Sequence, residues 1–307
     1  MGNEFKLLMI GAMYENGGNT THRFLDGHPQ LYVYPFESQP GTKYVLDHLS
    51  SMFPVKYRWP VFDLDATPYQ DYKAIIDEEG KVRSRTPYVS KFRDKPFDMN
   101  DDERCRIYQE YIAKSGRSRG KNMAAFFSAT FDAWKDYKRS GREVFHVGYS
   151  PIIGVDGDKI LRDLPTSHVL HVVRNPWSAY ADTKKRPVPL GLEHYMLGWT
   201  LNQQHALRFQ KQFPDRFHIV RAEDVMADSY KTLGGLLEKL GLEKAESLRK
   251  PSWNGEEMKE VYPWGTIRTP TPEANLKTAE ELNKEEREFI RSYTEVYQEA
   301  FGYRNFV

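Results

Sequence analysis

The chain has 307 residues, of which 39% are hydrophobic and 28% are charged, as expected of a globular protein with a sizeable core. Its 44 basic and 43 acidic residues leave a formal net charge of +1, which argues against a general nucleic-acid binder and against wholesale adhesion to an acidic membrane. Any site for a polyanion must therefore be a local basic pocket.

The single cysteine, Cys105, excludes an internal disulfide and is compatible with a reducing compartment. The first ten residues lack the layout of a signal peptide, and no apolar run is long enough to cross a bilayer. We therefore expect a cytoplasmic protein with no membrane span and no nucleic-acid partner. The sequence does not indicate an oligomeric state.

Apolar periodicity divides the chain into short strands and longer helices. In chain order it predicts a strand over 6–12, a helix over 20–25, a strand over 31–34 and a helix from Pro40 to about Met52. No clean period follows between about 54 and 100, which we interpret as an irregular insertion that serves as a lid or faces the substrate. The remainder predicts helices over 101–113, 122–138, 190–212, 225–240 and 279–301, and strands over 144–149, 168–173 and 218–221.

Short buried strands that alternate with helices predict an α/β fold, with one central parallel sheet flanked by helices in a single domain over 1–307. Ligands of such sheets bind at the carboxyl ends of the strands. We therefore expect the functional residues in the loops that follow Ala12, Tyr34, Tyr149 and Val173.

A glycine-rich loop follows the first strand, in the sequence Gly11-Ala-Met-Tyr-Glu-Asn-Gly-Gly-Asn-Thr-Thr21. Glycines let the backbone approach a ligand closely, and the free amides and dipole of a helix start favour an anion. This pattern predicts a phosphate or sulfate cradle, and the alternative is a tight strand–helix turn without a ligand. Asn19 replaces the lysine of the ATPase and kinase phosphate loop, so such an enzyme is a poor interpretation.

Arg174 ends a second buried strand, and Asn175-Pro176 then begins a helix. A guanidinium in this position can hold a phosphate through two parallel hydrogen bonds, and the basic run 184–186 adds positive charge. The alternative is that Arg174 pairs with a carboxylate and that the basic run is a solvated helix end.

Acidic and imidazole side chains near other strand ends have separate interpretations. Glu37 lies just past the second strand, where it is either a base for a substrate hydroxyl or a capping or ion-paired group. Glu223 and Asp224 are expected to cap a helix and hold it to the sheet edge. No cluster has metal-ligand spacing, so we expect no metal. We expect structural roles for the strand histidines, His146, His168 and His171.

Five short motifs occur in the order NGGNTT, LDGHP, HVVRNP, VRAEDV and EAFGY. In this order they resemble the sulfotransferase family that uses 3′-phosphoadenosine 5′-phosphosulfate (PAPS) as sulfuryl donor, over about 5–50 and 144–303. The resemblance implies a fold like that of P-loop nucleotide-binding proteins. It also implies metal-free transfer of a sulfuryl group to the hydroxyl of a sugar, a phenol or another small-molecule alcohol.

The resemblance also implies roles for individual residues. Glu37 would be the general base and Arg174 would hold the 3′-phosphate. The 5′-phosphosulfate would be held by Asn16, Gly17, Gly18, Asn19, Thr20 and Thr21. The stretch 261–271 lies where relatives close a loop over the nucleotide, with Arg268 against phosphate and Trp264 beside the adenine.

Two positions depart from the family pattern. Glu15 stands where relatives place a cation, and Arg23 or Lys43 would have to replace that charge. Asp182 stands where relatives place a phosphate-binding serine, a role that would pass to Ser178 or Thr183.

Two other functions stay open. One is a catalytically degenerate relative that binds a nucleotide or a glycan, which Glu15 and Asp182 favour. The other is a phosphotransferase on a similar fold, which the missing lysine disfavours.

Overall fold

A computed structural model describes residues 4–81, 95–258 and 271–307. Its central feature is a five-stranded sheet in the order β2-β3-β1-β4-β5, in which every neighbouring pair is parallel. The strands are β1 (Leu7–Ala12), β2 (Leu31–Val33), β3 (Phe145–Tyr149), β4 (His168–Val173) and β5 (Phe217–Arg221). The predicted parallel sheet is confirmed, and the predicted strand bounds agree with these to within one residue.

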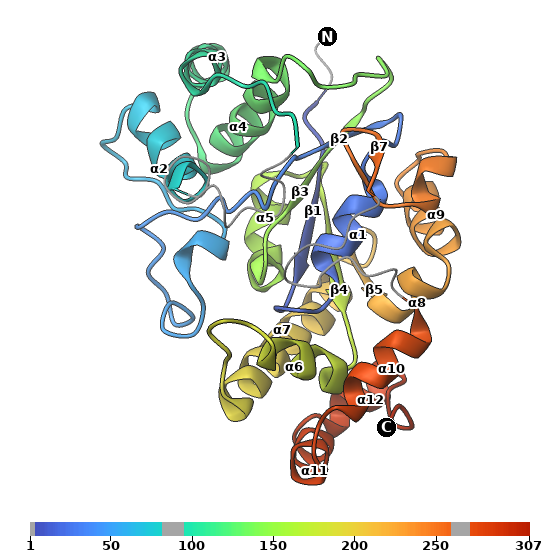
Figure 1. The fold of residues 1–307 in the computed structure, drawn as a ribbon. Coiled ribbons are helices and arrows are strands. Elements are labelled where there is room, and N and C mark those ends of the chain that lie inside the picture. Colours follow the sequence, from blue (N-terminus) through green and yellow to red (C-terminus); the bar gives the residue numbers. More distant parts are fainter. Residues whose placement is uncertain (1–3, 82–94, 259–270) are drawn as a thin grey trace.

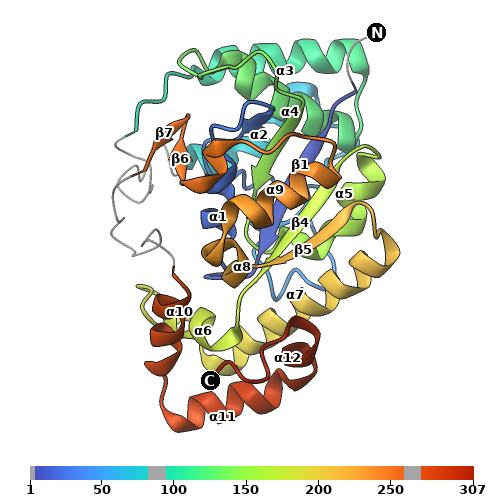
Figure 2. The same cartoon turned by 90° about the vertical axis from the view of Figure 1, so that its right-hand side faces the viewer.

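Helices cover both faces of the sheet (Figure 1). One face packs against α1 (Gly18–Leu25), α8 (Ala222–Ala227) and α9 (Ser229–Lys239), which lie in front of the strands in Figure 2. The other face packs against α4 (Arg119–Ala133), α5 (Gly157–Asp163) and α7 (Leu192–Gln212). In β1, Leu7 and Met9 face the second layer and Leu8 and Ile10 face the first, so the strand is buried on both sides.

The stretch between 54 and 100 is more regular than predicted. It contains η1 (Val55–Tyr57) and α2 (Pro68–Gly80), and α2 packs beside α3 (Asp101–Ser115) at the edge of the sheet. Thr67 caps α2 through the amide of Gln70, and Pro68 occupies the first helical position. Both are local signals for the start of a helix. Our prediction that this part of the insertion is irregular is therefore wrong.

The predicted helix from Pro40 to Met52 is also wrong, because tertiary ion pairs hold this segment in turns. The carboxylate of Asp47 accepts a 2.7 Å bond from the fully buried Arg58 and a 3.0 Å bond from Lys159. Arg58 in turn bonds Asp156 at 2.7 Å. Side chains from three distant segments therefore fix a loop that local propensity alone does not specify.

The other helices differ from their predictions mainly at their ends. The expected helix over 225–240 is broken at Asp228, whose side chain caps α9. The expected last helix is three helices, α10 (Pro272–Glu280), α11 (Lys284–Tyr293) and α12 (Glu295–Phe301), with Asn283 and Glu286 forming a capping box at α11. The remaining elements are α6 (Pro176–Lys184), η4 (Ile153–Asp156), η5 (Glu246–Arg249), and the short antiparallel pair β6 (Ser252–Trp253) and β7 (Glu256–Glu257).

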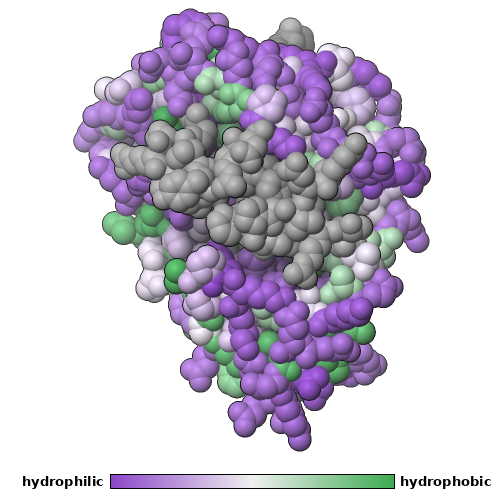
Figure 3. Space-filling view, in the orientation of Figure 1, coloured by the Kyte–Doolittle hydropathy of each residue, from purple (hydrophilic) through white to green (hydrophobic). Residues whose placement is uncertain are grey.

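No helix in the described part of the chain is both long and apolar enough to span a lipid bilayer. Where Figure 3 shows described residues, the surface is mainly hydrophilic, with hydrophobic residues scattered over it.

The three strand histidines have structural contacts, as predicted: His146 packs against Tyr32 and Phe131, and His168 bonds His218 at 3.1 Å. His171 is fully buried, its Nε2 bonds Gln203 Oε1 at 2.9 Å, and burial lowers the pKa of its imidazole to about 4. In the unfolded chain this imidazole has an ordinary pKa near 6.5. Between about pH 6.5 and 4 the imidazole is therefore protonated in the unfolded chain and neutral in the folded chain.

We expect acid to destabilise the fold in this window, and His171 to contribute up to roughly 3 kcal/mol of the loss. Urea unfolding at about pH 7 and about pH 4 checks this in the chain and in His171→Gln, which cannot take up the proton. The exposed His194→Gln serves as control. A His171→Gln variant that loses as much stability in acid as the parent chain contradicts the assignment.

Candidate active site

Strands β1 and β4 are neighbours, yet the chain leaves them in opposite directions across the sheet, from β1 toward β2 and from β4 toward β5. Such a switch point opens a crevice at the carboxyl ends of the strands. The two turns that follow these strands are in direct contact here. Asn16 Oδ1 accepts a 3.1 Å bond from the amide of Arg174, and Arg174 Nη1 donates to the carbonyl of Glu15 at 2.9 Å.

The first turn leads into α1 through Gly17, whose φ of 83° is a left-handed conformation that favours glycine. Helix α1 has no side-chain cap and no acidic residue in its first turn, so its first amides are available to an anion. Asn19 Nδ2 and Thr21 Oγ1 are buried and have no hydrogen-bond partner among the described residues. Buried polar groups are normally bonded, so these two atoms fit a ligand at this helix start.

Asn16 differs from the other predicted residues of this loop, because its side chain is used within the protein. It is 1% exposed, and its Nδ2 donates to the carbonyl of Tyr14 at 2.8 Å and to the hydroxyl of Tyr195 at 3.0 Å. Trp199 Nε1 donates to its Oδ1 at 3.1 Å. Asn16 therefore joins the two turns and α7, rather than presenting its amide to a ligand.

Gly18 brings the helix start into close contact with β3. A Cβ on this residue would lie 2.5 Å from Cε2 of Tyr149 and 2.8 Å from Cβ of Ala12. We expect Gly18→Ala to lower the unfolding free energy by roughly 1–3 kcal/mol, since neither neighbour has room to move in a packed layer.

Denaturant unfolding of this variant, compared with Gly235→Ala, tests that close packing. Gly235 lies inside α9, and a Cβ there would meet no atom within 4 Å. The control is expected to be neutral or to gain roughly 0.5–1 kcal/mol from reduced backbone entropy. Equal stability changes in the two variants would refute the close approach of Gly18 to Tyr149.

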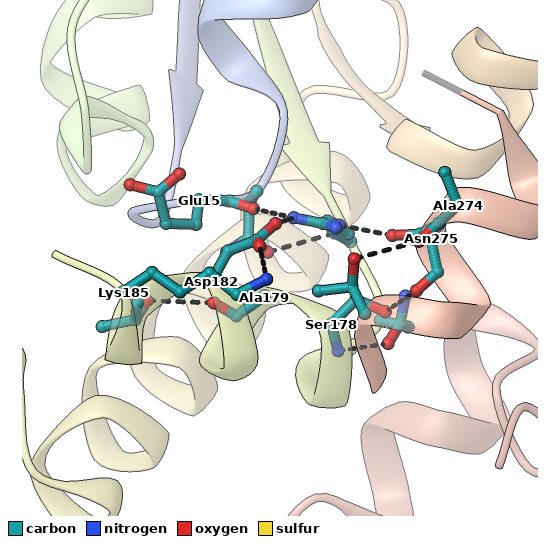
Figure 4. Close-up of polar contacts among 12 residues, drawn as sticks. Glu15, Ser178, Ala179, Asp182, Lys185, Ala274 and Asn275 are labelled. Atoms are coloured by element: carbon teal, nitrogen blue, oxygen red, sulfur yellow. Dashed lines mark hydrogen bonds and ion pairs between the residues drawn. The ribbon is translucent and has the colours of Figure 1, made fainter. Parts of the chain in front are cut away.

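The guanidinium of Arg174, the residue after β4, is held by three groups of the protein, and Figure 4 labels the residues that supply them, Glu15, Asp182 and Asn275. Nε donates to Asn275 Oδ1 at 2.6 Å, and Nη1 donates to the carbonyl of Glu15 and, at 2.8 Å, to Asp182 Oδ2. The alternative that Arg174 pairs with a carboxylate therefore describes this structure. The Nη2 group has no hydrogen-bond partner among the described residues, so one end of the guanidinium is open to a ligand.

The two hydroxyls proposed to replace the family's serine are both buried and both donate within the protein. Ser178 Oγ donates to the carbonyl of Asn275 at 2.7 Å, and Thr183 Oγ1 donates to the carbonyl of Ala179 at 2.9 Å. In this structure both hydroxyls therefore donate to backbone carbonyls of the protein itself.

The basic run at the end of α6 is largely ion-paired. Lys184 bonds Glu286 at 2.7 Å, and Lys185 bonds Glu281 at 2.8 Å and Asp182 at 3.2 Å. Arg186 lies 3.9 Å from the carboxylate of Glu15. Both acidic departures from the family pattern thus have cations beside them, Arg174 and Lys185 at Asp182 and Arg186 at Glu15.

The two cations suggested to replace the one that relatives place at position 15 have contacts of their own elsewhere. Arg23 is fully buried, donates to the carbonyl of Tyr34 at 2.9 Å, and lies 5.5 Å from the ring centre of Trp253. Lys43 is exposed and lies over its neighbour Tyr44 at 4.9 Å. Arg186, which we had considered only as part of the basic run 184–186, is a cation that lies beside the Glu15 carboxylate.

Glu37 is half-buried and lies beside the end of β3, because the next residue, Ser38, donates its amide to the carbonyl of Tyr149 at 2.7 Å. Gln39 donates to the Glu37 carboxylate at 3.2 Å. Burial, and to a smaller degree the Glu37 charge, raise the pKa values of the phenols of Tyr57 and Tyr149 well above their usual range. Since the Tyr149 ring also packs against Gly18, it links Glu37 to the first turn.

Glu223 has a structural role, as predicted, but it is not a side-chain cap of α8, and its partners lie in other elements. It lies in the first turn of α8, and its Oε1 accepts from the amide of Asn175 at 3.0 Å and from Asn275 Nδ2 at 2.9 Å. Its Oε2 accepts from the hydroxyl of Tyr303 at 2.7 Å. One carboxylate thus joins the turn after β4, α10 and the C-terminal segment.

Two neighbours of the candidate site were not predicted. Asn275 on α10 bonds Arg174 although 101 residues separate them, and no local pattern reveals such a contact. Tyr149 ends β3, and its position at a strand end was the available signal. Arg268 and Trp264 lie outside the described residues. Within the described ranges, no group of three or more His, Cys, Asp or Glu side chains is arranged to hold a metal ion.

Comparisons with known proteins place the chain in a family. Among the solved structures that resemble it over most of its length are three sulfotransferases with 11% to 16% identity. The sulfotransferase domain of the Synechococcus PCC 7002 olefin synthase has 16% identity and a TM-score of 0.47, covering 92% of this chain and 95% of that domain. The sulfotransferase domain of the curacin biosynthetic pathway has 13% identity and a TM-score of 0.45, covering 94% and 97%. A sulfotransferase from Mycobacterium avium has 11% identity and a TM-score of 0.46, covering 97% and 77%.

No curated protein matches the sequence significantly. The model of the sulfotransferase family, in contrast, matches residues 9–246. This range includes all five strands of the sheet except the first two residues of β1, together with both turns of the candidate site. Since the match extends over well over half of the chain, the protein belongs to the sulfotransferase family of enzymes.

Proposed function

We propose that this enzyme transfers a sulfuryl group from PAPS to the hydroxyl of a small-molecule or carbohydrate acceptor. The observation that supports this most is the contact of the two turns after β1 and β4 at the switch point of the sheet. One turn offers uncapped helix amides and the other a guanidinium, and both groups suit the phosphates of one nucleotide.

In this proposal the 5′-phosphosulfate lies against the first turn of α1. The amides of Gly17 to Thr20 and the two unpartnered buried groups, Asn19 Nδ2 and Thr21 Oγ1, would hold its oxygens. The 3′-phosphate would lie at Arg174, whose Nη2 is open among the described residues. Ser178 and Thr183 would support α6 from within, since both hydroxyls donate to backbone carbonyls.

Glu37 would accept the proton of the acceptor hydroxyl as the acceptor oxygen forms its bond to sulfur. The bond from sulfur to the 5′-phosphate oxygen breaks in the same transfer, and the helix start stabilises the charge that develops on that oxygen. Tyr14, Tyr57 and Tyr149 lie near Glu37, and the raised pKa values of all three keep them protonated at neutral pH. They would serve as hydrogen-bond donors or ring contacts for the acceptor, and not as bases.

Turnover with labelled donor tests the proposal. Purified protein is incubated with PAPS carrying a radioactive sulfuryl group and a panel of sugars, phenols and aliphatic alcohols. The expected result is a labelled acceptor formed in equal amount with 3′,5′-ADP. Nucleotide binding without transfer to any acceptor would instead support the degenerate binding relative, and Mg-dependent ATP turnover would support a phosphotransferase.

A further inference from the structure

The guanidinium of Arg174 donates to three acceptors of the protein, and their arrangement bears on phosphate binding. A two-pronged grip uses Nη2 together with either Nε or Nη1. Nε is bonded to Asn275 at 2.6 Å, and Nη1 is bonded to Asp182 at 2.8 Å and to the Glu15 carbonyl at 2.9 Å. In each possible pair of nitrogens, one nitrogen already donates to a group of the protein. A phosphate bound to Nη2 therefore forms the second bond of the grip only if it displaces Asn275 from Nε, or Asp182 or the Glu15 carbonyl from Nη1.

Asn275 is the acceptor that is fixed in place. It is 3% exposed, and its Nδ2 donates to Glu223 at 2.9 Å. Its own carbonyl accepts from the hydroxyl of Ser178 at 2.7 Å. In Figure 4, Asn275 lies on the right and Asp182, from α6, lies on the left, near Glu15. The two side chains thus reach Arg174 from different sides. Displacing Asn275 would break the link between α6, α8 and α10.

Asp182 is the acceptor that can leave. Its side chain is 28% exposed, and it already has a second cation, since Lys185 Nζ lies 3.2 Å from Oδ1. A phosphate and the Asp182 carboxylate are both anions, so they repel each other when they share one guanidinium. If the phosphate takes Nη1, Asp182 keeps its pairing with Lys185.

We propose that Asp182 competes with the nucleotide's 3′-phosphate for Arg174, and so determines how strongly the enzyme selects 3′-phosphorylated over 3′-unphosphorylated adenine nucleotides. The proposal rests on the proposed function, which puts the 3′-phosphate at Arg174. Asp182 is thus a specificity-determining residue that weakens one contact of the donor, and its removal is expected to strengthen that contact.

Calorimetric titration with 3′,5′-ADP and with 5′-AMP tests this in the parent chain, Asp182→Asn and Asp182→Ser. Asparagine retains the shape of the side chain and removes its charge, and serine also removes its bulk. We expect the affinity for 3′,5′-ADP to rise roughly 10- to 100-fold in both variants, the value of a hydrogen bond to a charged group, with little change for 5′-AMP. Glu281→Gln is the matched control, because Glu281 pairs with the same Lys185 and, within the described part of the chain, does not bond Arg174.

The ratio of the two affinities is the deciding quantity, since a general loosening of α6 would change both nucleotides alike. If the parent chain binds 3′,5′-ADP and neither variant raises the ratio above that of Glu281→Gln, the role of Asp182 is refuted while the proposed function stands. If none of these proteins binds either nucleotide, the proposed function fails, and the inference fails with it.

Discussion

Replacing Glu37 by glutamine is expected to lower the turnover of sulfuryl transfer roughly 100- to 10,000-fold, the usual contribution of a general base. The amide cannot accept the hydroxyl proton, but it retains the size of the side chain and its contact with Gln39. The nearby phenols cannot substitute for it, because burial keeps the pKa values of Tyr57 and Tyr149 well above the neutral range.

Two measurements separate a base from a structural carboxylate. Initial rates at saturating donor and acceptor give turnover, and calorimetry with 3′,5′-ADP gives nucleotide affinity, which is expected to stay unchanged. Glu243→Gln is the control, because Glu243 is an exposed carboxylate that pairs with Arg142. Turnover in Glu37→Gln equal to that of the parent chain would exclude Glu37 as the general base.

Replacing Arg174 by alanine is expected to weaken the binding of 3′,5′-ADP roughly 100-fold or more, since the loss includes at least one charge-assisted hydrogen bond to phosphate. Binding of 5′-AMP is expected to change far less, because that nucleotide has no 3′-phosphate. The affinity of Arg174→Lys for 3′,5′-ADP is expected to lie between those of the parent chain and Arg174→Ala. An ammonium retains the charge but cannot form the planar two-pronged grip.

The control for this series is Arg216→Ala. Arg216 also donates from its guanidinium to backbone carbonyls, those of Leu161 and Pro165, but it precedes β5 and so lies at the opposite edge of the sheet. Thermal unfolding of each variant reports any loss of fold, because Arg174 also bonds Asn275 and Asp182. Equal affinities for 3′,5′-ADP in Arg174→Ala and Arg216→Ala would exclude Arg174 from the nucleotide site.

The strands could be predicted from the sequence because each is a short apolar run that is buried on both faces. β4, for example, has the bounds His168–Val173 in both the prediction and the structure. The turns over 40–52 could not be predicted, since the Asp47–Arg58–Asp156 ion pairs that hold them join residues far apart in the chain. Helix α2 was predictable in principle, because Thr67, Pro68 and Gln70 form a helix start in the sequence itself.

The candidate site follows the same division. The turn at Gly17 and the arginine at 174 were predictable, since both follow buried strands, and the carboxyl ends of parallel strands meet at one edge. The groups that accept hydrogen bonds from Arg174 were not predictable. Asn275, for example, bonds it from α10, at a distance of 101 residues in the sequence. Asp182 was recognised as out of place in the sequence, but its bond to Arg174 required the geometry of α6.

The most direct test of this account is a crystal structure of the enzyme with 3′,5′-ADP. The account predicts the 5′-phosphate against the first turn of α1, at Gly17 to Thr21, and the 3′-phosphate on the guanidinium of Arg174, with both on one nucleotide that bridges the turns after β1 and β4. A nucleotide bound elsewhere on the chain, or one that touches only one of these two turns, would contradict it.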